Sequence, residues 1–212
     1  MITVSALSLA DPQATESYIR RTIQSSNIIK LDDLCIEKGK SAWKVQVTCV
    51  VLNHDGNITD AAILGCVAAL ADLHLPQTRI VKDSTTGQTV VRILEPSKSA
   101  SNQGRNGRSV RLQSIPVPLT FLILDGQMLV DPTFAEEAVC DGSITIVMDS
   151  ARLQSSPLSS STWPILSIQK LGGGVPTTLE SLEVCTQLAH GRAQELKALL
   201  QSLSPATEAL GS

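Results

Sequence analysis

The spacing of apolar residues along the chain predicts three helices. In the first and third segments apolar side chains lie on one helical face, and the middle segment is rich in Ala and Leu, typical of a helix buried on most sides. The first segment begins with Asp11-Pro12, a capping residue followed by a proline suited to the first helical position. The helices are predicted over residues 11–26, 60–73 and 177–203.

Alternating or continuous short apolar runs predict the strands. The segments are residues 44–52, 79–81, 89–94, 119–124, 128–130, 143–148 and 165–169. Asp125-Gly126 joins two of them and is the strongest hairpin signal in the chain. The order of helices and strands indicates an α+β or mixed α/β fold in which helices back a sheet.

Two segments have the composition of loops. Residues 95–108 are polar and rich in Ser, Asn and Gly, and residues 155–161 are rich in Ser. The first segment and its border carry Lys98, Arg105, Arg108 and Arg111. These side chains are candidates for contact with nucleic-acid phosphates, although a solvated loop is the favoured alternative.

Composition limits the classes of function. Hydrophobic residues make up 42% of the chain but aromatic residues only 2%, so the core must be aliphatic and few rings are available to stack on bases. The net charge of −3 argues against a free-standing nucleic-acid binder. The five cysteines have no metal-ligand spacing, which favours reduced thiols in an intracellular protein. No apolar run is long enough to span a membrane, and no secretory signal is visible.

Other candidate chemistry has a simpler structural interpretation. Asp131, Glu136, Glu137 and Asp141 could hold a divalent cation, but an acidic loop that begins a short helix is favoured. The glycine run at residues 172–174 matches no nucleotide-binding motif and is interpreted as a turn. The three histidines are far apart, and no nucleophile motif accompanies them.

Four stretches together resemble the RNase PH-like ring subunits of the eukaryotic RNA exosome. They are LDDLCI at 31–36, VLNHDGNITDAA at 51–62, LVDPT at 129–133 and GSITIVMD at 142–149. The resemblance implies an α+β, RNase PH-like fold, also described as ribosomal protein S5 domain 2-like, with a mixed sheet backed by helices. It divides the chain into part of a first half at residues 1–76 and a second half with the closing helix at residues 77–212.

The resemblance also implies that the catalytic site is degenerate. In members that degrade RNA with phosphate, an arginine at the position of Thr59 binds the attacking phosphate, and two aspartates stand at the positions of Glu137 and Ser143. A hydroxyl cannot replace a guanidinium, and only one carboxylate remains. We therefore expect no catalytic residues, no metal and no cofactor.

The implied function is structural. Such subunits hold a ring that guides RNA for 3′-to-5′ processing and degradation, including ribosomal RNA maturation and messenger RNA turnover, in the nucleus, nucleolus and cytoplasm. The expected partners are other RNase PH-like ring subunits, cap subunits and RNA, and no membrane. One alternative is an active phosphate-dependent 3′-to-5′ exoribonuclease, which Thr59 and Ser143 disfavour. The other is a stand-alone α/β protein.

Family members have further strands before the part that this chain resembles, and residues 155–164 look like an insertion. We therefore expect an incomplete first half, with open backbone groups beside the strand at residues 44–52. The isolated chain is expected to be aggregation-prone.

Overall fold

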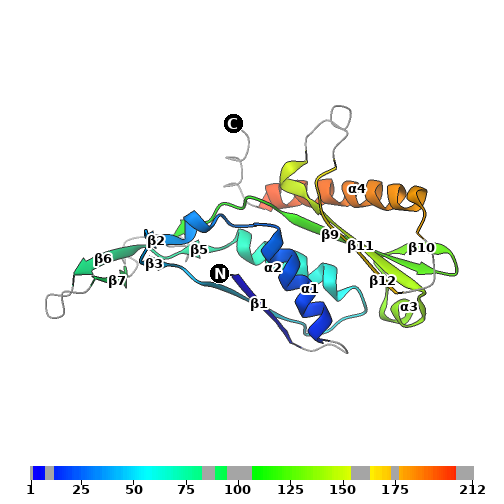
Figure 1. The fold of residues 1–212 in the computed structure, drawn as a ribbon, viewed down its shortest axis with the longest axis horizontal. Helices are drawn as coiled ribbons and strands as arrows, with labels where there is room; N and C mark the ends of the chain where they lie inside the picture. Colours follow the sequence, from blue (N-terminus) through cyan, green and yellow to red (C-terminus); the bar gives the residue numbers. More distant parts are fainter. Residues whose placement is uncertain are drawn as a thin grey trace.

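The computed structural model describes residues 2–7, 12–82, 89–94, 107–153, 163–172 and 177–203 of the 212-residue chain. Figure 1 shows an elongated molecule. A four-stranded sheet and its helices form one end, and small two-stranded sheets form the other. No helix among these residues is long and apolar enough to cross a membrane.

The four-stranded sheet has the order β10-β9-β11-β12 and is antiparallel throughout. The strands β9 and β10 are joined by Asp125 and Gly126, with φ of 49° and 74°, the left-handed pair that a tight hairpin requires. The bounds are β9 (Pro116–Leu124), β10 (Gln127–Val130), β11 (Gly142–Asp149) and β12 (Ile165–Gly172). The predicted hairpin at Asp125-Gly126 is therefore confirmed.

The central strands β9 and β11 are buried on both faces, because helices pack on the sheet from more than one side. The long helix α4 (Leu179–Leu203) packs on β9 and β11, while α2 (Ile58–Ala71) packs chiefly on β9. Figure 1 shows α4 along one side of the sheet and α1 (Pro12–Ser25) on the other. A continuous run of apolar residues is the sequence pattern that such doubly covered strands require.

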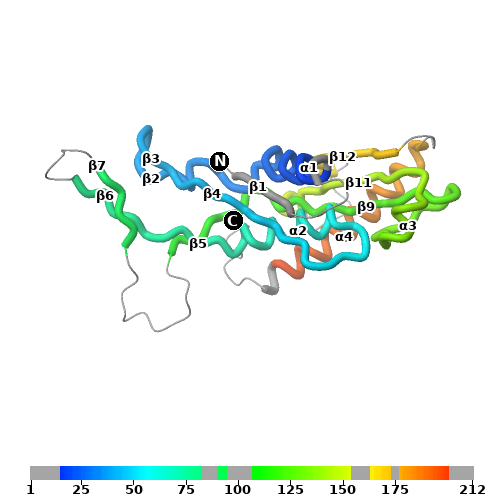
Figure 2. Tube along the Cα trace, turned by 90° about the horizontal axis from the view of Figure 1, so that it is seen from below, coloured from blue at the N-terminus to red at the C-terminus, as the bar shows by residue number. Residues whose placement is uncertain are grey.

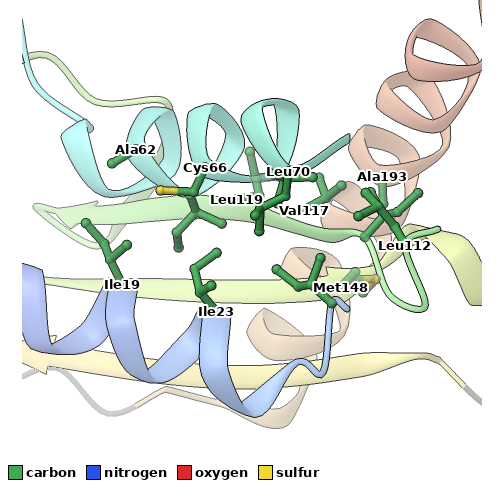
Figure 3. Close-up of a cluster of buried hydrophobic side chains, with 14 of the residues drawn as sticks. Ile19, Ile23, Ala62, Cys66, Leu70, Leu112, Val117, Leu119, Met148 and Ala193 are labelled. Atoms are coloured by element: carbon green, nitrogen blue, oxygen red, sulfur yellow. The ribbon is translucent and has the colours of Figure 1, made fainter. Parts of the chain in front are cut away.

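The core joins the two parts of the chain. Figure 3 shows Ile19 and Ile23 of α1 beside the same cluster as Cys66 and Leu70 of α2, all of them 1% exposed. Ala193 of α4, which is fully buried, belongs to this cluster as well. The aliphatic composition predicted this kind of core, and it forms one apolar cluster rather than two.

A parallel pair of strands lies beside α1 and α2. The strand β1 (Ile2–Leu7) pairs with β4 (Val45–Val50) along its whole length. The sequence predicted β4 but not β1, because six residues at the start of the chain gave no periodic signal. The backbone of β4 is therefore paired on one edge, where open groups were expected.

Three small antiparallel pairs complete the fold. They are β2 (Cys35–Glu37) with β3 (Ser41–Ala42), β5 (His74–Leu75) with β8 (Arg108–Ser109), and β6 (Thr78–Lys82) with β7 (Thr89–Ile93). Figures 1 and 2 both place the β6–β7 hairpin at the end of the molecule opposite to β10 and α3 (Phe134–Val139). A 3-10 helix, η1 (Leu31–Leu34), precedes β2, and η2 (Ser150–Arg152) follows β11.

The predicted loop at residues 95–108 lies mostly outside the described residues, as does the Ser-rich segment at 155–161. At its end the loop prediction is wrong, because Arg108 forms part of β8. This strand exists only through its pairing with β5, a tertiary contact without a local sequence signal. Of the glycine run, Gly172 ends β12 with φ of 82°, and the next two residues lie outside the description.

Candidate functional site

The loop that leads from β4 into α2 lies against the turn between β10 and α3. Gly56 has φ of 98°, and a Cβ atom at this position would lie 2.4 Å from the carbonyl oxygen of Pro132. The N–H of Phe134 donates a hydrogen bond of 2.9 Å to the carbonyl oxygen of Asp55. Only glycine permits so close an approach in this conformation. The two segments therefore form one site, although about 75 residues separate them.

Asn57 connects this loop to two carboxylates. It precedes α2 in a left-handed conformation, with φ of 46°. Its backbone N–H donates to Oε1 of Glu137 at 2.9 Å, and its side-chain Nδ2 donates to Oδ1 of Asp131 at 2.7 Å. A helix N-terminus attracts anions through its free N–H groups and its dipole. In this protein the Glu137 carboxylate already lies at the N-terminus of α2.

The short helix α3 holds Glu137 in place. Its N-cap, Thr133, accepts a hydrogen bond from the backbone N–H of Glu136, and the Glu136 carboxylate accepts from the Thr133 N–H at 2.8 Å. This is a capping box. The bond from the Thr133 backbone holds the pKa of the exposed Glu136 carboxyl below its usual value. The fixed first turn directs the neighbouring Glu137 toward α2.

Asp60 links α2 to the sheet. The strand β10 pairs only with residues 121–124 of β9, so the preceding part of β9 lacks a strand partner on that side among the described residues. There the N–H of Thr120 donates to Asp60 at 2.8 Å, and the Thr120 hydroxyl donates to the other carboxylate oxygen at 2.7 Å. The same hydroxyl lies 3.0 Å from that of Thr145 on β11. Asp60 thus satisfies the backbone of an open strand edge.

A groove of about 700 Å³ runs beside these residues, between α2, β9, β10 and α4. Its charged side chains are the carboxylates of Asp60, Asp131 and Glu195 and one guanidinium, that of Arg192. Arg192 is paired with Glu195 at 3.3 Å. The groove is therefore acidic, and its field opposes the binding of phosphate.

Thr59 and Ser143 lie in different elements of the fold, α2 and β11. Thr59 is half-buried in the first turn of α2, next to Asn57. Ser143 is half-buried in β11, opposite Leu122 of β9, and shares a face of the sheet with Thr145. Of the three positions expected to be degenerate, the structure brings Glu137 into direct contact with the start of α2.

The four predicted basic residues are described only in part. Lys98 and Arg105 lie outside the described residues. Arg108 in β8 is exposed, and its guanidinium donates to the carbonyl oxygen of Asp33. Arg111 is exposed just after β8.

Each of the acidic residues after β10 accepts a hydrogen bond. Asp131 and Glu137 bind Asn57, Glu136 binds Thr133, and the Asp141 carboxylate accepts from the N–H of Asp125 at 3.2 Å. Among the residues that the structure describes, no three His, Cys, Asp or Glu side chains gather as metal ligands. The contacts are those of the favoured interpretation, an acidic segment that begins a short helix.

The roles of Asn57 and Asp60 were not predicted from the sequence. The turn-forming residues Asp55-Gly56-Asn57 are a signal for a left-handed residue before the helix. A single aspartate in the first turn of an otherwise apolar helix was a further signal, because a buried carboxylate needs partners. The identity of those partners on β9 could not be inferred from local sequence.

Two sequence models of one family match the chain. The model of the 3′ exoribonuclease family, domain 1, matches residues 9–76, and that of domain 2 matches residues 114–192. Together these ranges cover more than half of the chain. Both residue sets of the site, the loop before α2 and the segment after β10, lie within the matched ranges.

The chain is similar to curated exosome proteins. Exosome complex component Rrp42 of Thermococcus onnurineus is 32% identical over 179 residues, which are 84% of this chain and 56% of that protein. Exosome complex component RRP45 of Bos taurus is 26% identical over 185 residues, 86% of this chain and 37% of that protein. The chain thus spans about half the length of the first of these relatives and less of the second.

Solved structures share the fold. A chain of an archaeal exosome core matches with a TM-score of 0.68 at 23% identity. The match covers 95% of this chain and 68% of that chain. The Archaeoglobus fulgidus exosome with RNA bound to the active site has a TM-score of 0.65 at 22% identity, with 93% and 69% covered. At these identities the likeness concerns the fold, which is RNase PH-like, as expected.

Proposed function

Because the chain belongs to the 3′ exoribonuclease family of RNase PH-like proteins, we propose that it acts as a non-catalytic structural subunit of an RNA exosome ring. In this role it helps to hold a ring that guides RNA during 3′-to-5′ processing and degradation. The names of its relatives, which are exosome components, support the assignment to that complex. Its partners would be other RNase PH-like ring subunits, cap subunits and RNA.

Thr59 and Ser143, which stand where active members have an arginine and an aspartate, carry the non-catalytic part of the proposal. Phosphorolysis needs a bound phosphate dianion, and the start of α2 is where a helix N-terminus would favour one. Here Thr59 brings no positive charge to balance the Glu137 carboxylate, which lies 2.9 Å from the Asn57 nitrogen. The acidic groove beside it adds to the repulsion. Thr59, Glu137 and Ser143 are accordingly proposed as degenerate active-site positions.

Finer assignments belong to the same proposal. The LVDPT signature at residues 129–133 resembles ribosomal RNA-processing protein 43 most closely among the non-catalytic subunits. The relatives reported above are named Rrp42 and RRP45, so they support the wider group and not that member. We further propose that residues 1–76 belong to the first RNase PH-like half and residues 77–212 to the second. The expected locations are the nucleus, nucleolus and cytoplasm.

We also propose that Lys98, Arg105, Arg108 and Arg111 contact RNA weakly. Each phosphate contact with single-stranded RNA contributes about 0.7 to the slope of log affinity against log salt. The fourfold alanine variant should lower that slope in the assembled complex. An unchanged slope would leave this segment as a solvated spacer.

The test of the function is affinity purification of the tagged chain from eukaryotic cells, followed by identification of its stoichiometric partners. The expected partners are RNase PH-like ring subunits, and a mock purification with the tag alone is the control. The alternative of an active exoribonuclease is tested by the release of nucleoside diphosphates from RNA. Recovery of the chain without ring subunits would contradict the proposal.

A further inference from the structure

The β6–β7 hairpin carries two arginines directly opposite each other. In its register Arg79 pairs with Arg92, and Val81 pairs with Val90 on the same face. Residues in direct cross-strand positions have Cβ atoms about 5 Å apart. Both arginine side chains are exposed. The hairpin thus presents two guanidinium groups side by side.

Nothing in the described part of the chain neutralises this pair. No ion pair or hydrogen bond of Arg79 or Arg92 with a described residue is present. Like charges directly opposite on a sheet are destabilising. Guanidinium forks, however, are well suited to phosphate oxygens, each of which accepts more than one hydrogen bond. The pair therefore has the chemistry of an anion-binding contact.

The position of the hairpin suits a long ligand. Figures 1 and 2 both show it at the far end of the molecule, away from the four-stranded sheet. Lys82 lies at the tip end of β6 and is exposed too. The described strands of the hairpin contain no aromatic residue, so they offer no ring for a base to stack on. The contact available is with a charged backbone, independent of base sequence.

We propose that the Arg79–Arg92 pair binds the phosphate backbone of single-stranded RNA. This inference rests on the proposed function, which brings RNA to the protein, and it adds an RNA contact outside the predicted basic segment. RNA is favoured over an acidic protein because planar guanidinium pairs match the closely spaced phosphates of a strand. The exposed apolar residues Ile80 and Ile93 alternate with the arginines and lie on the other face.

The test measures binding of the purified full chain to a fluorescent oligouridylate by anisotropy at several KCl concentrations. The Arg79→Gln/Arg92→Gln variant is compared with the wild type and with Arg20→Gln/Arg21→Gln, a matched pair of exposed arginines on α1. Removing two phosphate contacts should lower the log–log salt slope by about 1.4. The control pair should leave the slope unchanged. An Arg79→Lys/Arg92→Lys variant, which keeps both positive charges, should retain most of the wild-type salt slope.

The outcomes separate this inference from the proposed function. Two results would overturn the proposed Arg79–Arg92 contact, even if the chain purifies with ring subunits. One is the same salt slope in the wild type and the hairpin variant. The other is a wild type that does not bind RNA at low salt. A hairpin-dependent slope in a chain that never joins a ring supports the contact and counts against the function. A poly-glutamate peptide is the second probe. Affinity for it equal to that for RNA, and equally lost in the variant, would assign the pair to an acidic protein.

Discussion

Asp60 is a buried carboxylate whose charge is costly and whose hydrogen bonds are needed. It is 6% exposed, and burial raises the pKa of its carboxyl above the usual value, against the lowering effect of its bonds from Thr120 and Asn57. The folded protein therefore holds the proton more tightly than the unfolded chain does. The contribution of Asp60 to the free energy of unfolding is then greatest below the unfolded pKa of about 3.9 and is lost as the pH rises through the folded pKa.

An Asp60→Asn variant should remove this dependence, because the amide oxygen still accepts from Thr120 and cannot titrate. We expect the free energy of unfolding of the variant to gain on that of the wild type as the pH rises from about 4 to about 7. Asp60→Ala should cost about 1 to 3 kcal/mol at all these pH values, since the Thr120 N–H loses its acceptor. Urea denaturation at several pH values measures both. Parallel pH profiles for the wild type and the Asn variant would show that Asp60 does not titrate differently on folding.

Thr59 and Ser143 lead to the expectation that the chain does not phosphorolyse RNA. Losing one preorganised charge stabiliser typically costs about 10² to 10³ in rate, and here no guanidinium balances the Glu137 carboxylate beside the site. The purified chain, oligoadenylate, magnesium and phosphate should yield no nucleoside diphosphate above a mock preparation. Release that disappears in a Glu137→Gln variant would instead identify an active enzyme. The amide of that variant still accepts from Asn57, so the fold is preserved.

Residue identities and residue contacts differ in how far sequence predicts them. The absence of a guanidinium at Thr59 is visible in the sequence alone. The bond from Asn57 to Glu137 is not, because 80 residues separate the partners and only the packing of two loops brings them together. The sequence predicted which charged groups are missing, but it did not predict that the remaining carboxylate, Glu137, accepts a hydrogen bond from Asn57.

At the scale of elements, Gly56 and Gly126 make a matched pair. Both have positive φ, of 98° and 74°, but a Cβ on Gly126 would meet no atom within 4 Å, whereas one on Gly56 would collide with the turn at Pro132. Gly126→Ala should cost about 1 to 2 kcal/mol, the strain of a left-handed alanine. Gly56→Ala should cost clearly more, since the loop must also separate from α3. Chemical denaturation of the two variants gives the comparison.

Equal losses in the two glycine variants would mean that the loop before α2 can move away from α3 without penalty. The contact from Asn57 to Glu137 would then be dispensable for the fold. A second observable is the near-ultraviolet or NMR signal of Phe134. The centroid of its ring lies 5.7 Å from the centroid of the His54 ring. It should change in Gly56→Ala and not in Gly126→Ala.

Long periodic elements were predictable, and short paired ones were not. The helices predicted at residues 11–26, 60–73 and 177–203 correspond to α1, α2 and α4 within about two residues at each described end. The strands β1, β2, β3, β5 and β8 escaped prediction, because two to six residues carry little periodicity and depend on partners elsewhere in the chain. On α4 the residues with the least exposure are Cys185, Ala189 and Ala193, while Leu188 and Leu199 remain about half exposed. Small residues lie where the helix approaches the sheet closely.

At the scale of the whole molecule, stability is expected to fall along the long axis. The cluster that joins α1, α2 and α4 to the sheet contains most of the fully buried side chains, including Phe121, Ile146 and Met148. The β6–β7 hairpin has only two strands, and Ile80, Val90 and Ile93 are 44% to 59% exposed. Such a hairpin is marginally stable on its own.

Hydrogen exchange of the whole chain should therefore show a gradient. Amides in β11 and in residues 121–124 of β9, which have strand neighbours on both sides and buried side chains, should exchange only by global unfolding. Amides in β6 and β7 should exchange by local opening, faster by orders of magnitude, because opening them exposes little further apolar surface. The edge strand β12, paired on one side only among the described residues, provides an internal standard between the two. Mass-spectrometric exchange that shows equal protection of the hairpin and β9 would contradict this gradient. The hairpin would then be a rigid extension of the core. It would not be an arm that becomes ordered when the RNA backbone binds to Arg79 and Arg92.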